Sequence, residues 1–323
     1  MRSPTLPADT SVIPGTPVEP SPQILTGAGR RLFLATRPAF LTVTVVAVLL
    51  GLANAWRSHL PFNGLTALVT LVFALAAHAG ANVVNDFHDR DTDALNTERL
   101  FPFTGGSRFI QNGVLSPAVT AWLGYGLLAS VVPAGLWLIG QVGCGLFWIG
   151  LLGLFVGWAY SAPPLRLAAR GMGELAIALG WALVVVGSDF VQRGAFELHP
   201  IIAGLAYGLM VANLLYINQF PDAVADAAVG KLTVVARVGR RAAVNGYGVI
   251  AFCAGANVVA AVAVGLFPVA TLVALPALLP AFKAWQELRR HAEQPAALRP
   301  AIQATIVAAH LFGLLLAAAL VFA

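Results

Sequence analysis

Two polar strings with the same spacing stand out from an otherwise apolar chain. The pattern Asn-x-x-x-Asp-x-x-x-Asp occurs at Asn85, Asp89 and Asp93 and returns in the second half of the chain at Asn218, Asp222 and Asp226. A step of four residues turns an α-helix by about 400°, so we expect each trio to lie along one helix face. Carboxylates this close repel one another unless a cation neutralises them. The strings therefore predict the two halves of one divalent-metal site.

The donor atoms indicate which metal such a site would take. Carboxylate and amide oxygens without a nearby histidine or cysteine cluster favour a hard cation, and magnesium typically uses one or two carboxylates together with substrate phosphates. We therefore expect Mg²⁺ ions bridged by a diphosphate. The candidate ligands are Asn85, Asp86, Asp89, Asp93, Asp222 and Asp226. The alternative is an acidic helix end with Asp as its N-cap, but one such residue suffices for that and the second string stays unexplained.

Basic residues close to both strings could hold the diphosphate. Arg108 lies in GGSRFIQNGVLSP after the first string, and Lys231 and Arg237 lie in GKLTVVARVG after the second. The alternative is the ordinary excess of basic residues in cytoplasmic loops. Because Lys231 follows so soon after Asp226, we expect it to bind diphosphate.

A metal-bound diphosphate beside apolar helices has a natural chemistry. If it belongs to an allylic isoprenoid, the metal and a Lys or Arg stabilise the leaving group while an allylic carbocation forms. An electron-rich aromatic ring can then take the prenyl group, and the protein needs no covalent nucleophile. We expect Asp89, Asp93, Asp222 and Asp226 to be the catalytic carboxylates.

The composition indicates an all-α integral membrane protein. Of 323 residues 59% are hydrophobic and 10% are charged, and the mean hydropathy is +0.81. These values lie outside the range of soluble globular domains. The net charge of +5 is explained by membrane topology rather than by nucleic acid, because aromatic and basic residues are not interleaved as in a nucleic-acid reader.

Uncharged runs long enough to cross about 30 Å of hydrocarbon occur along the whole chain. They predict nine transmembrane spans, at 38–57, 63–86, 115–139, 143–161, 172–190, 200–219, 242–264, 267–285 and 301–322. With the N-terminus inside, all Lys and Arg residues except Arg57 and Arg193 fall on the cytoplasmic side, as the positive-inside rule requires. We expect a multi-pass protein of the inner (cytoplasmic) membrane, with its N-terminus and both aspartate strings facing the cytoplasm.

One transmembrane domain is expected over residues 30–323, with the strings at 85–93 and 218–226 marking a pseudo-repeat. The preceding residues, 1–29, are rich in proline. Without a continuous hydrophobic core, they predict a disordered cytoplasmic tail rather than a signal peptide.

Together the motifs resemble the UbiA superfamily of intramembrane prenyltransferases over about residues 30–323. The first motif is Asn85-Asp86-x-x-Asp89-x-x-x-Asp93, and the second is Asp222-x-x-x-Asp226-x-x-x-Gly230-Lys231-x-Thr233. The segments GGSR, YSAPPLRL, GMGE and NQFPD look most like the branch that prenylates 1,4-dihydroxy-2-naphthoate in menaquinone synthesis.

This resemblance implies nine transmembrane helices around a central cavity, with two cytoplasmic caps that carry the aspartate motifs and bind Mg²⁺ with the prenyl diphosphate. It assigns Arg108 and Lys231 to the diphosphate and matches Asn218 to an asparagine of the naphthoate branch. Tyr160 and Arg166 fall in a loop that the superfamily places near substrate. The implied partners are a polyprenyl diphosphate, an aromatic acceptor and the lipid bilayer, and neither nucleic acid nor an obligatory protein partner is inferred.

Two departures from the family pattern bear on the acceptor. Pro221 stands where naphthoate enzymes often have arginine, which weakens the naphthoate assignment. The Arg-Pro turn common in the benzoate and haem branches is replaced by Phe101-Pro102-Phe103, which argues against those branches.

Three alternatives remain open at this point. The acceptor could be another aromatic acid or a chlorin, or the cation could be used internally, as in a terpene cyclase. A secondary transporter is disfavoured because its ion sites usually lie near the bilayer midplane, whereas both strings end cytoplasmic spans.

The roles of His78, Asn82 and His88 are also open. Polar groups inside a span are functional candidates by default, but a satisfied packing role explains them equally well.

Overall fold

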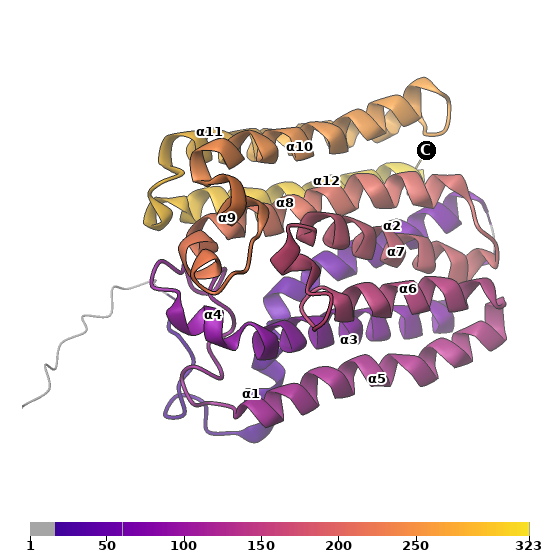
Figure 1. Ribbon diagram of the computed structural model, residues 1–323. Helices are drawn as coiled ribbons and strands as arrows, with labels where there is room; N and C mark the ends of the chain where they lie inside the picture. The colour runs from indigo at the N-terminus through magenta and orange to yellow at the C-terminus, as the bar shows by residue number, and fades with distance from the viewer. Residues whose placement is uncertain (1–16, 60, 323) are drawn as a thin grey trace, which may run out of the picture.

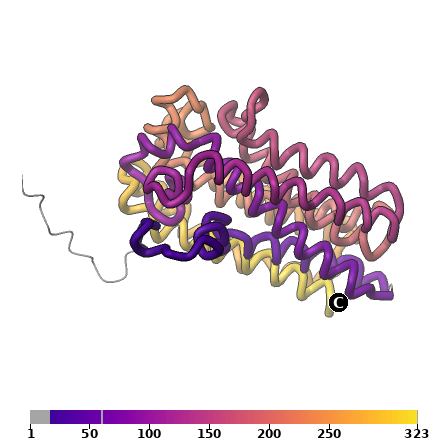
Figure 2. Tube along the Cα trace, turned by 90° about the horizontal axis from the view of Figure 1, so that it is seen from below, coloured from indigo at the N-terminus to yellow at the C-terminus, as the bar shows by residue number. Residues whose placement is uncertain are grey.

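The computed structural model describes residues 17–59 and 61–322, and all regular structure within these residues is helical. The long helices lie side by side with their axes roughly aligned, and the arrangement persists in the perpendicular view (Figures 1 and 2). The helix bounds are α1 Ala28–Ala35, η1 Pro38–Leu41, α2 Thr42–Arg57, α3 Gly64–His88, α4 Arg90–Leu95, α5 Pro117–Val142, α6 Gly145–Ala159, η2 Leu167–Arg170, α7 Gly173–Arg193, α8 Leu198–Ala228, α9 Val234–Val238, α10 Arg240–Ala263, η3 Val269–Ala277, α11 Leu278–His291, η4 Pro295–Leu298 and α12 Arg299–Phe322.

The expected all-α membrane fold is confirmed, but the count of nine spans is not. Among the described residues, eight helical segments are long and apolar enough to cross a membrane, and they coincide with eight of the predicted spans. The remaining predicted span, 143–161, is the apolar helix α6, which has 15 residues. At 1.5 Å per residue it is about 22 Å long, less than the roughly 30 Å of a hydrocarbon core.

Small residues let the central helices approach closely. The helices α7 and α8 meet where a Cβ built on Gly204 would lie 2.9 Å from the carbonyl oxygen of Ala182. On the other side of the bundle, a Cβ at Gly80 of α3 would lie 3.0 Å from the carbonyl oxygen of Gly124 in α5. Such contacts are typical of helix packing in membranes. They bring α3 and α8, the two helices that carry the aspartate motifs, into one bundle.

The two motifs sit differently on their helices. The second trio lies on α8, which continues past the predicted end of its span at residue 219 to Ala228, so this motif is not carried by a separate cap. The first trio is interrupted at Asp89, whose backbone angles (φ −94, ψ 6) separate α3 from α4. The amides of Asp89 and Asp93 still donate to the carbonyls of Asn85 and Asp89 at 2.8 Å, so the helical spacing is kept.

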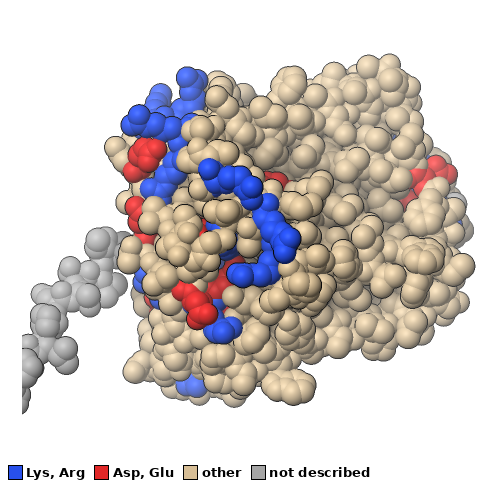
Figure 3. Space-filling view, in the orientation of Figure 1, with Lys and Arg blue, Asp and Glu red and all other residues tan. Residues whose placement is uncertain are grey.

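Both motifs reach the same end of the bundle. There α4 carries Asp93 of the first motif and leads into the loop 96–116, and the loop 229–233 with α9 follows the second motif (Figure 1). Basic side chains gather at this end on the face that Figure 3 shows. The expectation that the motifs would open on one side of the molecule is met by the fold.

The expected disordered tail is wrong for its last part. Residues 1–16 lie outside the described residues, but residues 17–27 pack against the loop 96–116 and α1 begins at Ala28. Leu25 is buried with Ala35, Phe109 and Val114. Pro20 accepts a hydrogen bond from the side chain of Asn112 at 2.9 Å. A few well-placed contacts therefore order a segment that is poor in apolar residues.

Candidate functional site

A cavity of about 730 Å³ joins the two aspartate motifs to the interior of the bundle. Its polar end is lined by Asn85, Asp89, Asp93, Tyr160, Asn218, Asp222 and Lys231. From Asp89 its lining follows α3 down to Thr70, about 28 Å at the rise of an α-helix. The rest of this length is lined mainly by aliphatic and aromatic side chains of α5, α6 and α7. The cavity is therefore charged at one end and apolar along the rest of its length.

Lys231 connects the two motifs across the polar end. Its Nζ donates to Oδ2 of Asp89 at 2.7 Å and lies 3.3 Å from Oδ1 of Asp226. Burial by itself would lower the pKa of Lys231, but Asp89 and Asp226 outweigh it and raise that pKa well above the usual value. The lysine is therefore a fixed cation between two rows of oxygen ligands that face each other.

Further contacts hold the carboxylates in place. Asn85 donates to Oδ2 of Asp89 at 2.8 Å, and Asn96 donates to Oδ1 of Asp222 at 2.6 Å. Asp93 is buried beside Gly106. Burial, and then the neighbouring Asp86 and Asp89, raise the pKa of Asp93 well above its ordinary value. Buried carboxylates crowded in this way gain from a bound cation.

The residues at this end fit a magnesium site that is completed by substrate. Among the described residues, no three acidic, His or Cys side chains converge on one point. Magnesium does not need such a cluster, because it typically takes one or two carboxylates with phosphate oxygens and water. Asp89, Asp93 and Asp222 all line the cavity and offer the oxygen donors that this mode of binding requires. The ammonium group of Lys231 also suits a diphosphate, which would meet the carboxylates only through the bound cation.

The structure separates the predicted site residues into two groups. Those that line the cavity are Asn85, Asp89, Asp93, Asn218, Asp222, Tyr160 and Lys231, and those that do not are Asp86, Arg108, Arg166 and Asp226. Asp226 still reaches the site through Lys231, whereas Asp86 is buried and accepts the backbone amide of Ser107 at 3.1 Å. Arg166 lies at the turn before η2.

Arg108 is directed away from the cavity. Its Nη1 donates to the backbone carbonyl of Asp93 at 2.6 Å, and its Nε faces Glu19 at 3.6 Å. Burial, and then the nearby Arg99, lower the pKa of Arg108. The predicted contact with diphosphate is not visible in this arrangement, because the guanidinium lies behind the first motif.

Sequence reasoning missed Arg37 as a site residue. It lines the cavity, donates to the carbonyl of Phe103 at 3.3 Å and stacks over Phe40 at 4.4 Å. The sequence had placed it only as a cytoplasmic basic residue, and the one available signal was its position directly before a span. Together with Lys231 it gives the cavity two cations.

Two polar atoms along the cavity are candidates for contact with a ligand. Oδ1 of Asn218 and Nε1 of Trp181 are buried without a hydrogen-bond partner among the described residues, and both residues line the cavity. Buried polar groups are rarely left unpaired, so these two are available to a bound molecule.

The residues with open roles are satisfied within the protein. His78 lines the cavity, where its Nδ1 is 2.8 Å from Oγ1 of Thr44, and Asn82 donates to the carbonyl of Thr36 at 3.3 Å. His88 instead meets the hydroxyl of Tyr125 at 2.8 Å.

A family comparison decides the class of the chain. The model of the UbiA prenyltransferase family matches residues 44–309, which is most of the sequence. The chain belongs to this family. The resemblance seen in the motifs and the enzyme class that it implied, a prenyltransferase, are thereby confirmed.

Curated relatives come from several branches of the UbiA family. The chain is 28% identical over 221 residues to UbiA prenyltransferase domain-containing protein 1 of Dictyostelium discoideum, covering 64% of each chain. It is 27% identical over 214 residues to the 1,4-dihydroxy-2-naphthoate octaprenyltransferase of Haemophilus influenzae, covering 63% of this chain and 67% of the other. The match thus spans about two thirds of the length of these relatives.

Solved UbiA structures share the fold. A UbiA homolog from Aeropyrum pernix K1 matches with a TM-score of 0.63 at 18% identity, covering 82% of this chain and 94% of the other. A UbiA homolog from Archaeoglobus fulgidus, bound to DMAPP and Mg²⁺, matches with a TM-score of 0.55 at 15% identity, covering 88% and 99%. At these identities the likeness establishes the architecture.

Proposed function

We propose that this UbiA protein is a Mg²⁺-dependent enzyme that transfers a polyprenyl group from an allylic diphosphate to 1,4-dihydroxy-2-naphthoate. The reaction would take place at the cytoplasmic face of the inner membrane. The observation that carries the proposal is one cavity with two aspartate motifs and Lys231 at its mouth and a long apolar interior. The acceptor is supported by the naphthoate-like segments and by the relative from Haemophilus influenzae.

The residues of the chain divide the work between them. Lys231 and Arg37 neutralise the diphosphate as negative charge develops on its leaving oxygen. The apolar walls hold the hydrocarbon tail and exclude water from the allylic cation. Asp89, Asp93 and Asp222 would hold Mg²⁺, whose chemistry here is to neutralise the leaving diphosphate.

The reaction balances without any further reactant. The carbon–oxygen bond of the allylic diphosphate breaks and pyrophosphate leaves with the electron pair. A new carbon–carbon bond forms at the ring carbon that carries the carboxylate, and carbon dioxide leaves from the same carbon.

The proposal is tested with purified protein in lipid, Mg²⁺, a labelled polyprenyl diphosphate and a panel of aromatic acids. The expected product is a prenylated naphthoquinol that has lost the carboxylate, identified by mass. Prenylation of a different acceptor would show that the naphthoate assignment is wrong. A cyclised hydrocarbon formed without any acceptor would show that the enzyme is a cyclase rather than a transferase. No consumption of prenyl diphosphate would overturn the proposal as a whole.

A further inference from the structure

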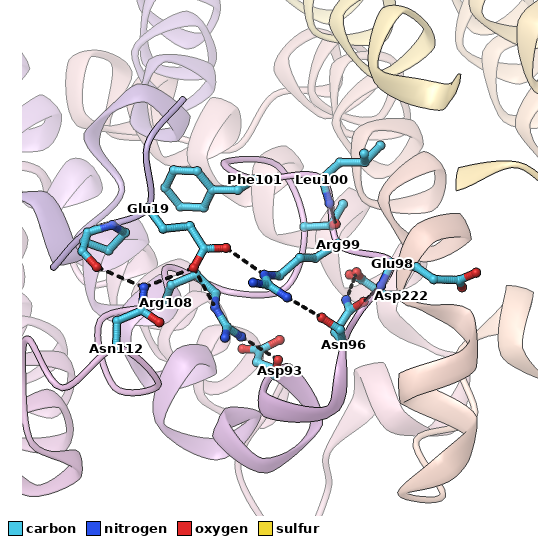
Figure 4. A network of polar contacts seen from close by, with 12 residues as sticks. Glu19, Asp93, Asn96, Glu98, Arg99, Leu100, Phe101, Arg108, Asn112 and Asp222 are labelled. Carbon is cyan, nitrogen blue, oxygen red and sulfur yellow. Dashed lines mark hydrogen bonds and ion pairs between the residues drawn. The ribbon is translucent and has the colours of Figure 1, made fainter. Parts of the chain in front are cut away.

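The side chain of Glu19, in the segment before α1, lies at the centre of a polar network that reaches both aspartate motifs (Figure 4). Its Oε1 accepts a hydrogen bond from Nε of Arg99 at 2.8 Å. Its Oε2 accepts one from the amide of Asn112 at 3.1 Å and lies 3.6 Å from Nε of Arg108. One carboxylate therefore serves two guanidinium groups.

The network has one arm toward each motif. On the first arm, Arg108 donates to the backbone carbonyl of Asp93 at 2.6 Å. On the second, Arg99 donates to the carbonyl of Asn96 at 2.9 Å, and the amide of Asn96 donates to Asp222 at 2.6 Å. Figure 4 shows both arms starting from the same carboxylate.

The two arginines depend on Glu19 for their charge balance. The side chain of Arg108 is only 8% exposed, and its Nε has no hydrogen bond within the described residues. Arg99 stands close enough to Arg108 to lower its pKa, so the two guanidiniums repel each other. Removing one partner of a buried charge leaves the other uncompensated, and it then seeks a new partner. On the first arm the remaining carboxylate is that of Asp93, to whose backbone carbonyl Arg108 already donates.

The anchoring of Glu19 is built into the fold. Pro20 is held by Asn112, Leu25 is buried against Phe109, and Nε of Arg31 donates to the carbonyl of Leu25. These contacts hold residues 19–25 on the loop 96–116.

We propose that Glu19 is a positioning residue that holds Arg99 and Arg108 away from the carboxylates of the aspartate motifs and so keeps them free for a divalent cation. The inference rests on the proposed function, because it concerns the metal site of that reaction. Glu19 does not line the cavity, and it acts through the two arginines.

The test measures Mn²⁺ binding by electron paramagnetic resonance, with the full chain in lipid nanodiscs and without any prenyl diphosphate. Glu19→Gln, which keeps the size and removes the charge, is expected to raise the apparent dissociation constant about 10- to 100-fold, the usual cost of losing an outer-shell partner. Glu287→Gln is the matched control, because Glu287 also pairs with two basic residues, Arg290 and His291, but lies on α11 with no contact to either motif.

A double variant separates positioning from a purely structural role. In Glu19→Gln with Arg108→Gln, the guanidinium released beside Asp93 is gone while that of Arg99 remains, so Mn²⁺ affinity is expected to return part of the way toward that of the wild type. A double variant that binds no better than Glu19→Gln would overturn the inference, as would unchanged or tighter Mn²⁺ binding in the single variant. If Glu19→Gln does not fold, Glu19→Asp decides, since the shortened carboxylate must weaken Mn²⁺ binding and an unchanged affinity refutes the role.

Failure of the proposed function can be told from failure of this inference. Mn²⁺ binding needs no acceptor and no turnover, whereas the product assay on the wild-type chain tests prenyl transfer alone. A wild-type protein that binds Mn²⁺ but transfers no prenyl group refutes the function and leaves the Glu19 result to stand on its own.

Discussion

Lys231 and Asp89 join the two aspartate motifs through an ion pair of 2.7 Å between Nζ and Oδ2. The pair links the end of α3 with the loop after α8, and it places a fixed positive charge at the mouth of an apolar cavity. We propose that this lysine holds the diphosphate there.

Lys231→Ala is expected to slow prenyl transfer about 100-fold or more, because it removes the cation that meets charge on the leaving group. Initial rates at varied prenyl diphosphate measure both turnover and KM. Lys283→Ala is the control, since Lys283 is exposed on α11. Normal kinetics in Lys231→Ala would remove this residue from the site.

Loss of a carboxylate at the polar end is expected to abolish turnover. Asp89→Ala and Asp222→Ala should each lower the rate at least about 100-fold while the protein still inserts, because each removes an oxygen donor at an accessible end of the bundle. Product formation and membrane extraction are measured together. Activity retained in both variants would defeat the metal assignment.

Two glycines of the same loop offer a matched test of the backbone beside Asp93. Gly106 and Gly113 have positive φ angles of 72° and 67°, so alanine strains both by about 1–2 kcal/mol. Only at Gly106 would the added Cβ meet the carboxylate of Asp93. Gly106→Ala should therefore lose most transfer activity and Gly113→Ala little, as measured by product rates at matched protein amounts. Equal losses would show that strain, rather than displacement of Asp93, is responsible.

Filling the cavity should shorten the prenyl chain that it accepts. Gly150 lines the cavity on α6 and has no atom within 4 Å of an added Cβ, so Gly150→Leu can project into the space for the tail. Long polyprenyl diphosphates should become poor substrates while short ones stay good, measured by kcat/KM over a series of chain lengths. Gly126→Leu on α5, also open but not lining the cavity, should leave the series unchanged. If kcat/KM in Gly150→Leu depends on chain length as it does in the wild type, the prenyl tail does not lie beside Gly150.

Magnesium and pH are expected to act together on stability. Burial and nearby carboxylates raise the pKa of Asp93 above its usual 3.8, so the folded state binds this proton more tightly than the unfolded chain. Without metal, the free energy of unfolding therefore falls as pH rises from about 4 towards the raised pKa. Mg²⁺ offsets the repulsion, so it should raise Tm more at about pH 8 than at about pH 5.5, as thermal unfolding would show. Equal shifts at both pH values would contradict this account.

The sequence was most informative where periodicity and charge act locally. Apolar runs gave the spans because the cost of burying polar backbone leaves few other options in a bilayer. The four-residue spacing of Asp222 and Asp226 correctly predicted that both lie on the same helix. The span ending at residue 219 was too short, because α8 continues through Pro221 into AVADAA, where alanine favours the helix.

Long-range loop geometry was beyond the sequence. Arg108 was expected at the diphosphate, but the loop turns it behind Asp93, at a residue with positive φ. Arg37 enters the cavity because Phe103 and Phe40, far apart in the chain, hold its guanidinium. The docking of Glu19 depends on charges contributed by a loop some eighty positions away.

The unbroken course of α8 has a mechanical consequence. Asp222 and Asp226 belong to one continuous helix that packs within the bundle, whereas the chain leaves the regular course of α3 at Asp89 and Asp93 is held by the loop 96–116 through Arg108. We therefore expect α8 to stay in place while the segment from Asp89 to Asp93 moves to admit a substrate and release its products. Backbone hydrogen exchange should be faster in that segment than in the part of α8 that carries Asp222 and Asp226.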